Sequence, residues 1–265
     1  MGAPTSETDF YTRLFRGAER RAPGGEPIAT RIASMLAVEA GDKVLVMGCG
    51  AGVVARMVAK TSRCFVTCAD RDEASLAALK QGAAKDGVEG LLTPVQGDFR
   101  TMPVPPVGYQ AVVVEGSLRY LGQSFDEVTS DARKFLTQNG LLVVSASARV
   151  GRTTPAAVEA LFAERGEALR QPWQLSAALE KTGFEPLAAE AYADTVMDEW
   201  YRYVEQALAA LPAGGPESDA KPAAALRREI DVYRREGGRA SINEVLYIAR
   251  RKEPGEKPPP SRGGE

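Results

Sequence analysis

Hydrophobic and polar positions alternate with two different periods along the middle of the chain. Short valine-rich runs, with the length and composition of buried β-strands, begin at residues 43, 64, 91, 110 and 140. Between them, apolar residues recur every three or four positions, which predicts amphipathic helices over residues 52–60, 72–87 and 124–140. Apolar strands that alternate with helices are typical of a parallel sheet with helices on both faces, so we expect an α/β fold.

The two ends of the chain follow a helical pattern instead. Helical stripes run through residues 10–15 and 28–36 before the first strand. After a sixth strand at 184–192, two amphipathic helices with stripes at 197–211 and 226–233 come before a last strand at 242–250. A long helical insertion between two strands is typical of a functional lid.

These patterns divide the chain into a core and its additions. The expected parts are disordered ends at 1–8 and 252–265, N-terminal helices that form a lid or cap at 9–40, a core at 41–193 and 241–251, and the helical insertion at 194–240.

The composition excludes several classes of function. The chain has 265 residues, 44% hydrophobic and 26% charged, and a net charge of -2, so it has no overall attraction for nucleic acid or an anionic membrane. It contains no run of the roughly 18 apolar residues that a membrane span needs. Its start also lacks a signal-peptide pattern, so we expect a cytoplasmic protein.

The absence of histidine limits the chemistry further. Without histidine, the commonest general base and the usual metal ligand are excluded, and so are catalytic triads that use an imidazole. The three cysteines, Cys49, Cys64 and Cys68, make neither a disulfide framework nor a zinc ligand set. We therefore expect no metal site.

A glycine-rich turn follows the first strand, with Gly48, Gly50 and Gly52 at alternate positions. Glycines there let a ligand approach the main chain, and the next helix offers free N–H groups. A phosphate loop would need Gly-Lys-Ser/Thr after the turn, and a dinucleotide loop would need its third glycine at Val53. The turn alone leaves the ligand open.

Acidic residues end three successive strands at the same edge of the predicted sheet. Asp70 ends the second strand, Asp98 the third and Glu115 the fourth, and Phe99 follows Asp98. Ligands of open α/β sheets bind at this edge. Three carboxylates there would repel a pyrophosphate and attract a cation.

With these motifs in order, the sequence resembles the class I S-adenosylmethionine-dependent methyltransferases. The motifs are "VLVMGCGAG", "GDF", "VVVEGSLRYL" and "ARKFLTQNGLLVVS", and the resemblance covers roughly residues 28–190 plus the late strand "VLYIARRKE". It is strongest to the small-molecule branch, which includes sarcosine/dimethylglycine, tocopherol and arsenite methyltransferases. Arsenite methylation fits poorly, because the chain lacks the several cysteine thiols that it requires. The resemblance implies a Rossmann-like seven-stranded sheet in the order 3-2-1-4-5-7-6 with the last strand antiparallel.

The resemblance also implies a binding site for S-adenosylmethionine. The implied contacts are Gly48, Cys49, Gly50 and Gly52 with the methionine part, Asp70 with the ribose, Asp98 with the adenine amino group, Arg71 and Phe99 with the faces of the ring, and Glu115 at the end of the fourth strand. Glu115 stands where the family more often has Asp or Asn. The segment "EGSL" also differs from the N/D-P-P-Y tetrapeptide of enzymes that methylate nucleic-acid amino groups.

Methyl transfer from a sulfonium is an in-line displacement, for which the enzyme mainly supplies geometry and a dry site. Without histidine, an acceptor nitrogen, sulfur, acidic carbon or phenol is favoured over an alcohol. Glu115 could act as a weak base, orient the sulfonium or only cap the following turn, and Tyr11 and Tyr120 are further catalytic candidates. Other acceptor-side candidates are Arg119, Tyr192, Trp200, Tyr201 and Tyr203, and each also suits a purely structural position.

Two other functions fit the same motifs. A catalytically silent subunit that binds S-adenosylmethionine would keep the glycine turn and both aspartates, and a nicotinamide-dependent oxidoreductase fits the glycine spacing less well. Arginines at 13, 16, 20 and 21 suit a solvated helix face better than an anion site. The acceptor and the oligomeric state stay open.

Overall fold

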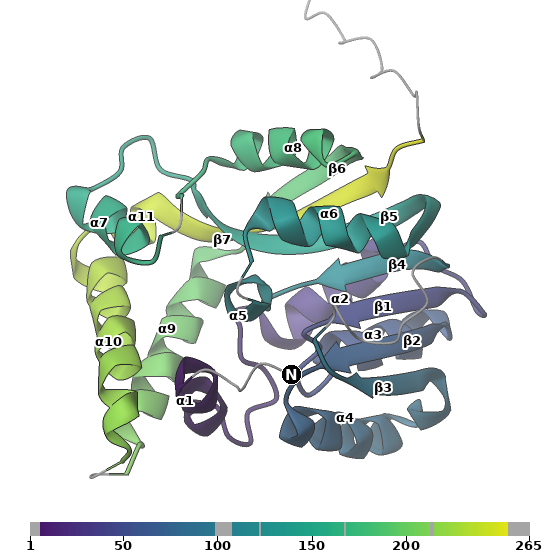
Figure 1. Cartoon of the computed structure of the whole chain (residues 1–265), viewed down its shortest axis with the longest axis horizontal. Helices are drawn as coiled ribbons and strands as arrows, with labels where there is room; N and C mark the ends of the chain where they lie inside the picture. Colours follow the sequence, from purple (N-terminus) through teal and green to yellow (C-terminus); the bar gives the residue numbers. More distant parts are fainter. Residues whose placement is uncertain (1–5, 99–107, 122, 167, 213–214, 254–265) are drawn as a thin grey trace, which may run out of the picture.

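The computed structural model of the chain describes residues 6–98, 108–121, 123–166, 168–212 and 215–253. In this part, one seven-stranded sheet has the order β3-β2-β1-β4-β5-β7-β6 (Figure 1). The strands are β1 Lys43–Met47, β2 Phe65–Asp70, β3 Leu92–Gln96, β4 Tyr109–Val114, β5 Leu136–Arg149, β6 Phe184–Ala191 and β7 Ile242–Arg251. The first five are parallel and β7 is antiparallel to both β5 and β6, which confirms the predicted topology.

Helices cover the faces of this sheet, and further helices lie beyond one end of it. They are α1 Ser6–Leu14, α2 Gly25–Met35, α3 Val53–Ser62, α4 Glu73–Asp86, α5 Leu118–Leu121, α6 Phe125–Phe135, α7 Ala156–Glu164, α8 Pro172–Lys181, α9 Asp194–Ala209, α10 Ala220–Arg235 and α11 Gly238–Ser241, with short 3-10 turns η1 Glu89–Leu91 and η2 Glu217–Asp219. Helix α7 and the short helices α5 and α11 were not predicted from the sequence pattern.

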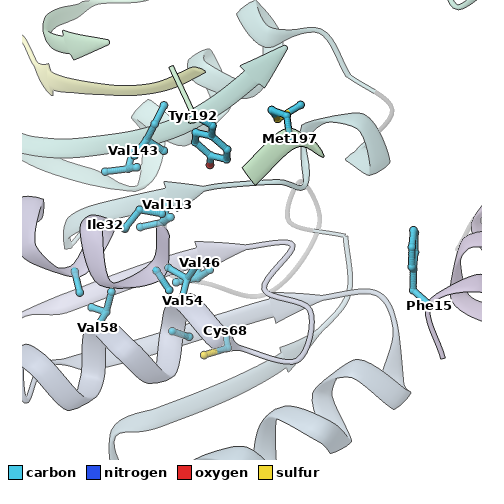
Figure 2. Close-up of a cluster of buried hydrophobic side chains, with 14 of the residues drawn as sticks. Phe15, Ile32, Val46, Val54, Val58, Cys68, Val113, Val143, Tyr192 and Met197 are labelled. Atoms are coloured by element: carbon cyan, nitrogen blue, oxygen red, sulfur yellow. The ribbon is translucent and has the colours of Figure 1, made fainter. Parts of the chain in front are cut away.

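The hydrophobic core has two layers because side chains alternate between the two faces of each strand. On one face, Val46 of β1 belongs to a cluster with residues of α2, α3 and α4, and Leu45 belongs to a cluster with α6 and α8 on the other. Figure 2 shows the first layer, where Val113 and Val143 continue the row of Val46 beneath Ile32. Burial on both faces explains why the strands read as continuous apolar runs.

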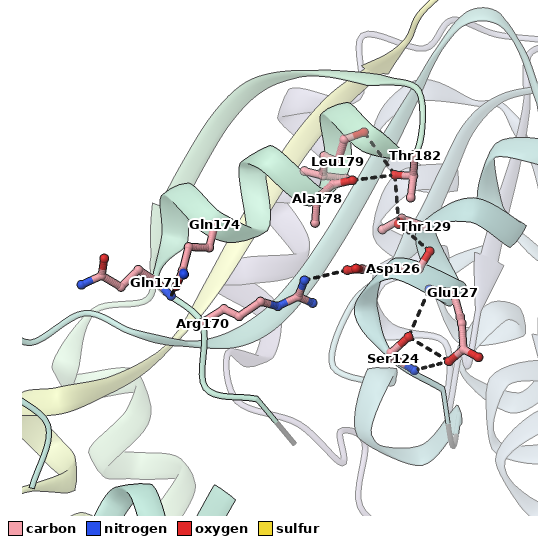
Figure 3. Close-up of polar contacts among 10 residues, drawn as sticks. All are labelled: Ser124, Asp126, Glu127, Thr129, Arg170, Gln171, Gln174, Ala178, Leu179 and Thr182. Atoms are coloured by element: carbon pink, nitrogen blue, oxygen red, sulfur yellow. Dashed lines mark hydrogen bonds and ion pairs between the residues drawn. The ribbon is translucent and has the colours of Figure 1, made fainter. Parts of the chain in front are cut away.

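Polar contacts fix the helices of the second face (Figure 3). Ser124 and Glu127 form a capping box at the start of α6, and the side chains of Thr129 in α6 and Thr182 after α8 are 3.2 Å apart. Arg170, just before α8, donates to Asp126 over 2.7 Å. These contacts join α6 to α8 on the side of the sheet away from α2 and α3.

Two expected boundaries are wrong. The helix predicted over residues 124–140 ends at Phe135, and β5 starts at Leu136, which is fully buried and pairs with Tyr109. The disorder expected over residues 1–8 does not hold for residues 6–8, because α1 begins at Ser6 and buries Phe10 completely. At the other end, Lys252 N donates to Gly183 O over 3.0 Å, and residues 254–265 lie outside the described part of the chain.

The N-terminal helix and the helical insertion lie together at one end of the sheet (Figure 1). The Phe15 ring lies 5.5 Å from that of Trp200 and 6.0 Å from that of Tyr203, centre to centre. Arg13 also pairs with Asp219, and its Nε donates to that carboxylate over 3.1 Å. We use the word cap for α1, residues 15–24, α9 and α10.

Buried polar groups hold the insertion together. Glu229 of α10 accepts hydrogen bonds from Arg165, directly after α7, over 2.6 Å and from Tyr201 of α9 over 3.0 Å. Tyr201 also stacks on Tyr233, with ring centres 3.9 Å apart. The helices of the insertion are therefore joined to each other and to α7 by partners that the sequence pattern does not reveal.

Candidate cofactor site

The glycine turn after β1 leads directly into α3. Gly48, Gly50 and Gly52 all have left-handed φ angles, of 64°, 54° and 77°. The Cys49 N–H donates to the Ala69 carbonyl over 3.0 Å, so the turn stays attached to the end of β2. Such backbone angles favour glycine because any other L-residue is strained there.

The three glycines differ in what surrounds them. A Cβ at Gly48 would lie 2.4 Å from the Ser117 Cβ, and one at Gly52 would lie 2.6 Å from Leu79. A Cβ at Gly50 would have no heavy atom within 4 Å. Packing thus demands glycine at 48 and 52, whereas Gly50 faces open space in which a ligand can contact bare main chain.

Asp70 connects the end of β2 to the glycine turn. One carboxylate oxygen accepts from Gly50 N over 2.7 Å, and the other accepts from Asp72 N over 2.9 Å. Burial raises the pKa of Asp70 above its usual value, and these two N–H groups offset part of that rise. The structure therefore brings together two of the residues predicted to bind a cofactor.

Arg71 and Asp98 also lie together, at the ends of β2 and β3. The Arg71 guanidinium donates to Asp98 over 2.8 Å and to the Leu121 carbonyl over 3.5 Å. Phe99, the other predicted ring contact, lies outside the described residues. Contact of Arg71 and Asp98 with an adenine ring stays a prediction.

Glu115 is the most enclosed acid at this edge, with a side chain that is 3% exposed. Arg20 donates to both of its carboxylate oxygens over 2.6 Å, and the Tyr192 hydroxyl donates to one of them over 2.9 Å. Burial, and after it the nearby Glu115 charge, raise the pKa of Tyr192 well above 10, so this phenol stays a neutral donor. Donors therefore engage both oxygens of the Glu115 carboxylate.

Two arginines have a role that the sequence pattern did not indicate. Arg20 and Arg21 follow the end of α1 and are mostly buried, so the solvated helix face expected for them is wrong. Arg21 donates to Asp72 over 2.6 Å, and its carbonyl accepts from the Tyr120 hydroxyl over 3.1 Å. Because Glu115 lies 95 positions from Arg20 in sequence, no local pattern could have paired them.

The predicted aromatic residues occupy several different environments. Tyr11 contacts Tyr120 edge to face, with ring centres 5.1 Å apart, and both are half-buried. Tyr201 is buried in the insertion, whereas Trp200 and Tyr203 lie closer to the surface. The side chain of Arg119 lies outside the described part of the structure.

A cavity of about 650 Å³ lies between residues 18–27, α3 and α9. Its lining includes Arg20 and Val53 together with Trp200 and Tyr203. Since Arg20 binds Glu115 and Val53 follows the glycine turn, the cavity adjoins the candidate cofactor site. Its volume suits a small organic molecule.

The described residues also bear on metal sites and membrane spans. No cluster of three or more His, Cys, Asp or Glu side chains among them could hold a metal ion. Within the same residues, none of the helices has both the length and the apolar character needed to cross a membrane.

Part of the chain matches a known family model. Residues 44–140 match the family model described as "Methyltransferase domain", and this range contains the glycine turn and all three acids. The fold, the turn and the match together confirm the resemblance to class I S-adenosylmethionine-dependent methyltransferases.

One curated methyltransferase is similar in sequence to a short segment of the chain. The chain is 32% identical over 114 residues to the sterol 24-C-methyltransferase ERG6B of Gibberella zeae, a segment that is 43% of this chain and 30% of that protein. The chain spans less than a third of the length of the curated relatives it matches.

Solved structures show the same fold over nearly the whole chain. An S-adenosylmethionine-dependent methyltransferase of Geobacter sulfurreducens, in complex with S-adenosyl-L-homocysteine, matches 92% of this chain and 98% of its own, with a TM-score of 0.77 at 16% identity. A Galdieria sulphuraria protein, provisionally named a sarcosine dimethylglycine methyltransferase, matches 94% and 99% of the two chains, with a TM-score of 0.70 at 13% identity. At these identities the likeness concerns the fold.

Proposed function

We propose that this protein is an S-adenosylmethionine-dependent methyltransferase that acts on a small-molecule acceptor. The observation that supports it most is the contact between Gly50 and Asp70, which couples the open main chain of the turn to a carboxylate at the end of β2. The methyltransferase-domain match covers both residues.

The residues at this edge fit such a cofactor. The bare backbone at Gly50 and the N-terminus of α3 would hold the carboxylate of its methionine part. Asp70 would accept hydrogen bonds from the ribose hydroxyls in place of the Gly50 N–H, and Arg71 and Asp98 would line the base. When bound, S-adenosylmethionine supplies an activated methyl group on a cationic sulfur.

The protein's own residues then position the acceptor and exclude water. Arg20 and Arg21 hold residues 15–24 against Glu115 and Asp72, which closes the edge of the sheet beside the turn. In this arrangement Glu115 anchors the cap and contributes electrostatically, since Arg20 and Tyr192 occupy both of its oxygens. Direct transfer to a neutral amine needs no base at the position of Glu115.

The cavity beside Arg20 and Val53 is the proposed acceptor site. Its lining includes Trp200, Tyr203 and Glu199, whose rings and carboxylate suit an amine through cation–π contact and charge. An acceptor nitrogen is therefore our first choice, and sulfur or an acidic carbon or phenol follow. The named relatives methylate different kinds of acceptor, so they do not narrow this choice.

A catalytically silent binding subunit is the second candidate. The enclosure of Glu115 favours it, because no unengaged base lies at the end of β4 among the described residues. Methyl transfer to any acceptor in a pool of amines, thiols and phenols would exclude this candidate.

The first experiment is calorimetric titration of S-adenosylhomocysteine and, separately, of NADH into the wild type and the variant Asp70→Ala. We expect micromolar binding of S-adenosylhomocysteine alone, weakened about a hundredfold in the variant by the loss of two ribose hydrogen bonds. Asp126→Ala, which removes an acid on α6, is the matched control and keeps wild-type affinity. Binding of NADH instead would support the oxidoreductase, and no binding of either compound would refute the proposal.

A further inference from the structure

Two of the three cysteines lie close to each other at the glycine turn. Cys49 is the half-buried residue between Gly48 and Gly50, and Cys68 is a fully buried residue of β2. Figure 2 shows Cys68 beside Val54 on the α3 side of the sheet, and Cys49 packs against this same hydrophobic cluster. Neither cysteine is in a disulfide.

The register of the sheet and one main-chain hydrogen bond place the two cysteines near each other. Val46 of β1 lies opposite Cys68, and Met47 lies opposite Ala69. Past the end of β1, Cys49 N donates to the Ala69 carbonyl over 3.0 Å, so Cys49 lies beside the residue that follows Cys68. The Cys68 side chain is near enough to raise the pKa of the Cys49 thiol, which itself donates to the Gly50 carbonyl over 3.6 Å.

The third cysteine is excluded from this arrangement. Cys64 precedes β2 at its other end, four positions before Cys68. Because a strand rises about 3.3 Å per residue, Cys64 lies roughly 13 Å from Cys68, well beyond disulfide reach. Cys64 is thus a matched control within the same protein.

We propose that Cys49 and Cys68 form a reversible dithiol–disulfide site that controls access to the glycine turn. A disulfide requires the two sulfur atoms to approach to about 2.05 Å, so Cys49 must move toward β2. The glycines on either side of Cys49 give the backbone the freedom to do so. This movement would pull Gly50 away from Asp70 and reshape the surface against which the cofactor lies.

The oxidant we assign is a hydroperoxide, which can reach half-buried Cys49. The Cys49 thiolate attacks the terminal peroxide oxygen, the O–O bond breaks, and the alcohol or water leaves with a proton, which yields a sulfenic acid. The Cys68 sulfur then attacks the sulfenic sulfur and displaces hydroxide, which leaves as water with the Cys68 proton. The two sulfurs together lose two electrons, and the peroxide gains them.

The environment makes this site slow at neutral pH. The contact with Cys68, burial, and the charge of Asp70 raise the pKa of the Cys49 thiol well above its usual value. Only the thiolate attacks peroxide, so the rate of oxidation should rise roughly tenfold per pH unit below that pKa. A slow dithiol responds to sustained peroxide and not to brief exposure.

The test uses the full-length wild type, Cys68→Ala and Cys64→Ala. Each protein is treated with hydrogen peroxide at pH 8, alkylated and digested without reduction, and its disulfides are mapped by mass spectrometry. We expect a Cys49–Cys68 disulfide in the wild type and in Cys64→Ala. In Cys68→Ala, Cys49 should appear only as oxyacids. Separate alkylation of Cys49 and Cys68 in the treated wild type, or a disulfide that involves Cys64, would overturn the proposal.

The effect on the cofactor rests on the proposed function and has its own measurement. Calorimetry should show about tenfold or weaker binding of S-adenosylhomocysteine to the oxidised wild type, with full recovery after dithiothreitol. Saturation with S-adenosylhomocysteine should also slow disulfide formation, because the ligand covers Cys49. Unchanged affinity after oxidation would refute control of the turn. If the reduced wild type binds no S-adenosylhomocysteine, the proposed function fails, and disulfide mapping still decides whether the dithiol site exists.

Discussion

At the scale of single residues, the candidate site is organised by carboxylates with different partners. Asp70 accepts two main-chain N–H groups, Asp98 pairs with Arg71, and Glu115 is enclosed by Arg20 and Tyr192. The first two can exchange these partners for a ligand at the open edge. Glu115 cannot do so without leaving a buried guanidinium unpaired, and this distinction predicts a large structural effect at Glu115.

We expect Glu115→Ala to lower the free energy of unfolding by about 3–5 kcal/mol, the usual cost of removing one partner of a buried ion pair. The Arg20 and Glu115 side chains are 12% and 3% exposed, so water cannot replace the lost carboxylate. Urea unfolding followed by circular dichroism measures the change. The double variant Arg20→Met/Glu115→Gln should recover most of the loss, because no unpaired charge remains.

The control for this prediction is Glu190→Ala, which breaks an ion pair to Arg31 whose side chains are 51% and 40% exposed. Solvent screens that pair, and its loss should be too small to measure. Equal effects of Glu115→Ala and Glu190→Ala would contradict the structural role given to Glu115.

At the scale of elements, the glycine turn combines a packing requirement with a binding requirement. Gly48 and Gly52 allow close contact with Ser117 and Leu79, and Gly50 leaves its outer side open. Substitutions at positions two residues apart should therefore affect different properties of the protein.

Gly48→Ala should lower stability more than Gly50→Ala, and Gly50→Ala should lower affinity for S-adenosylhomocysteine about tenfold or more. Both variants carry the left-handed strain of about 1–2 kcal/mol. Only Gly48→Ala adds a contact of 2.4 Å with the Ser117 Cβ, and overpacking costs about 1–3 kcal/mol more. Thermal unfolding and calorimetry separate the two effects.

Gly87→Ala is the control for the turn. Gly87 ends α4 with a φ of 65° and has no atom within 4 Å of its would-be Cβ, so it carries the same strain far from the glycine turn. It should lose stability like Gly50→Ala and keep full affinity. If Gly50→Ala also keeps full affinity, the open side of the turn does not face the ligand.

The sequence predicts these elements well because their signals are local. Valine-rich strands, the glycine turn and the terminal acids each occupy a few consecutive residues, and the parallel topology brings the acids to one edge. The end of α6 was missed because the apolar spacing continues past Phe135, and only the pairing of Leu136 with Tyr109 makes that segment a strand. The partners of Arg20 and Arg21 depend on long-range packing, which no sequence period encodes.

At the scale of the whole molecule, pieces from both ends of the chain close one edge of the sheet. Arg13, Phe15 and Arg20 connect the N-terminal segment to η2, to α9 and to β4 respectively. Arg13 and Phe15 therefore join the two parts of the cap, the N-terminal segment and the insertion, and Arg20 and Arg21 attach the N-terminal segment to the candidate site. If the N-terminal segment is a lid, weakening its attachment to the insertion should speed the exchange of cofactor while the cofactor contacts remain intact.

Asp219→Asn tests this lid. Asp219 lies on η2, away from the glycine turn, and its carboxylate holds Arg13 of α1. Loss of a partly exposed ion pair of about 1 kcal/mol should speed the dissociation of S-adenosylhomocysteine about fivefold in stopped-flow fluorescence. The reporter is the Trp200 indole, which lies against Phe15.

Asp231→Asn, which breaks the exposed pair with Arg235 on α10, is the control and should leave the rate unchanged. Identical dissociation rates in Asp219→Asn and the wild type would mean that the N-terminal segment is a fixed wall of the site. The cofactor would then enter without any movement of α1.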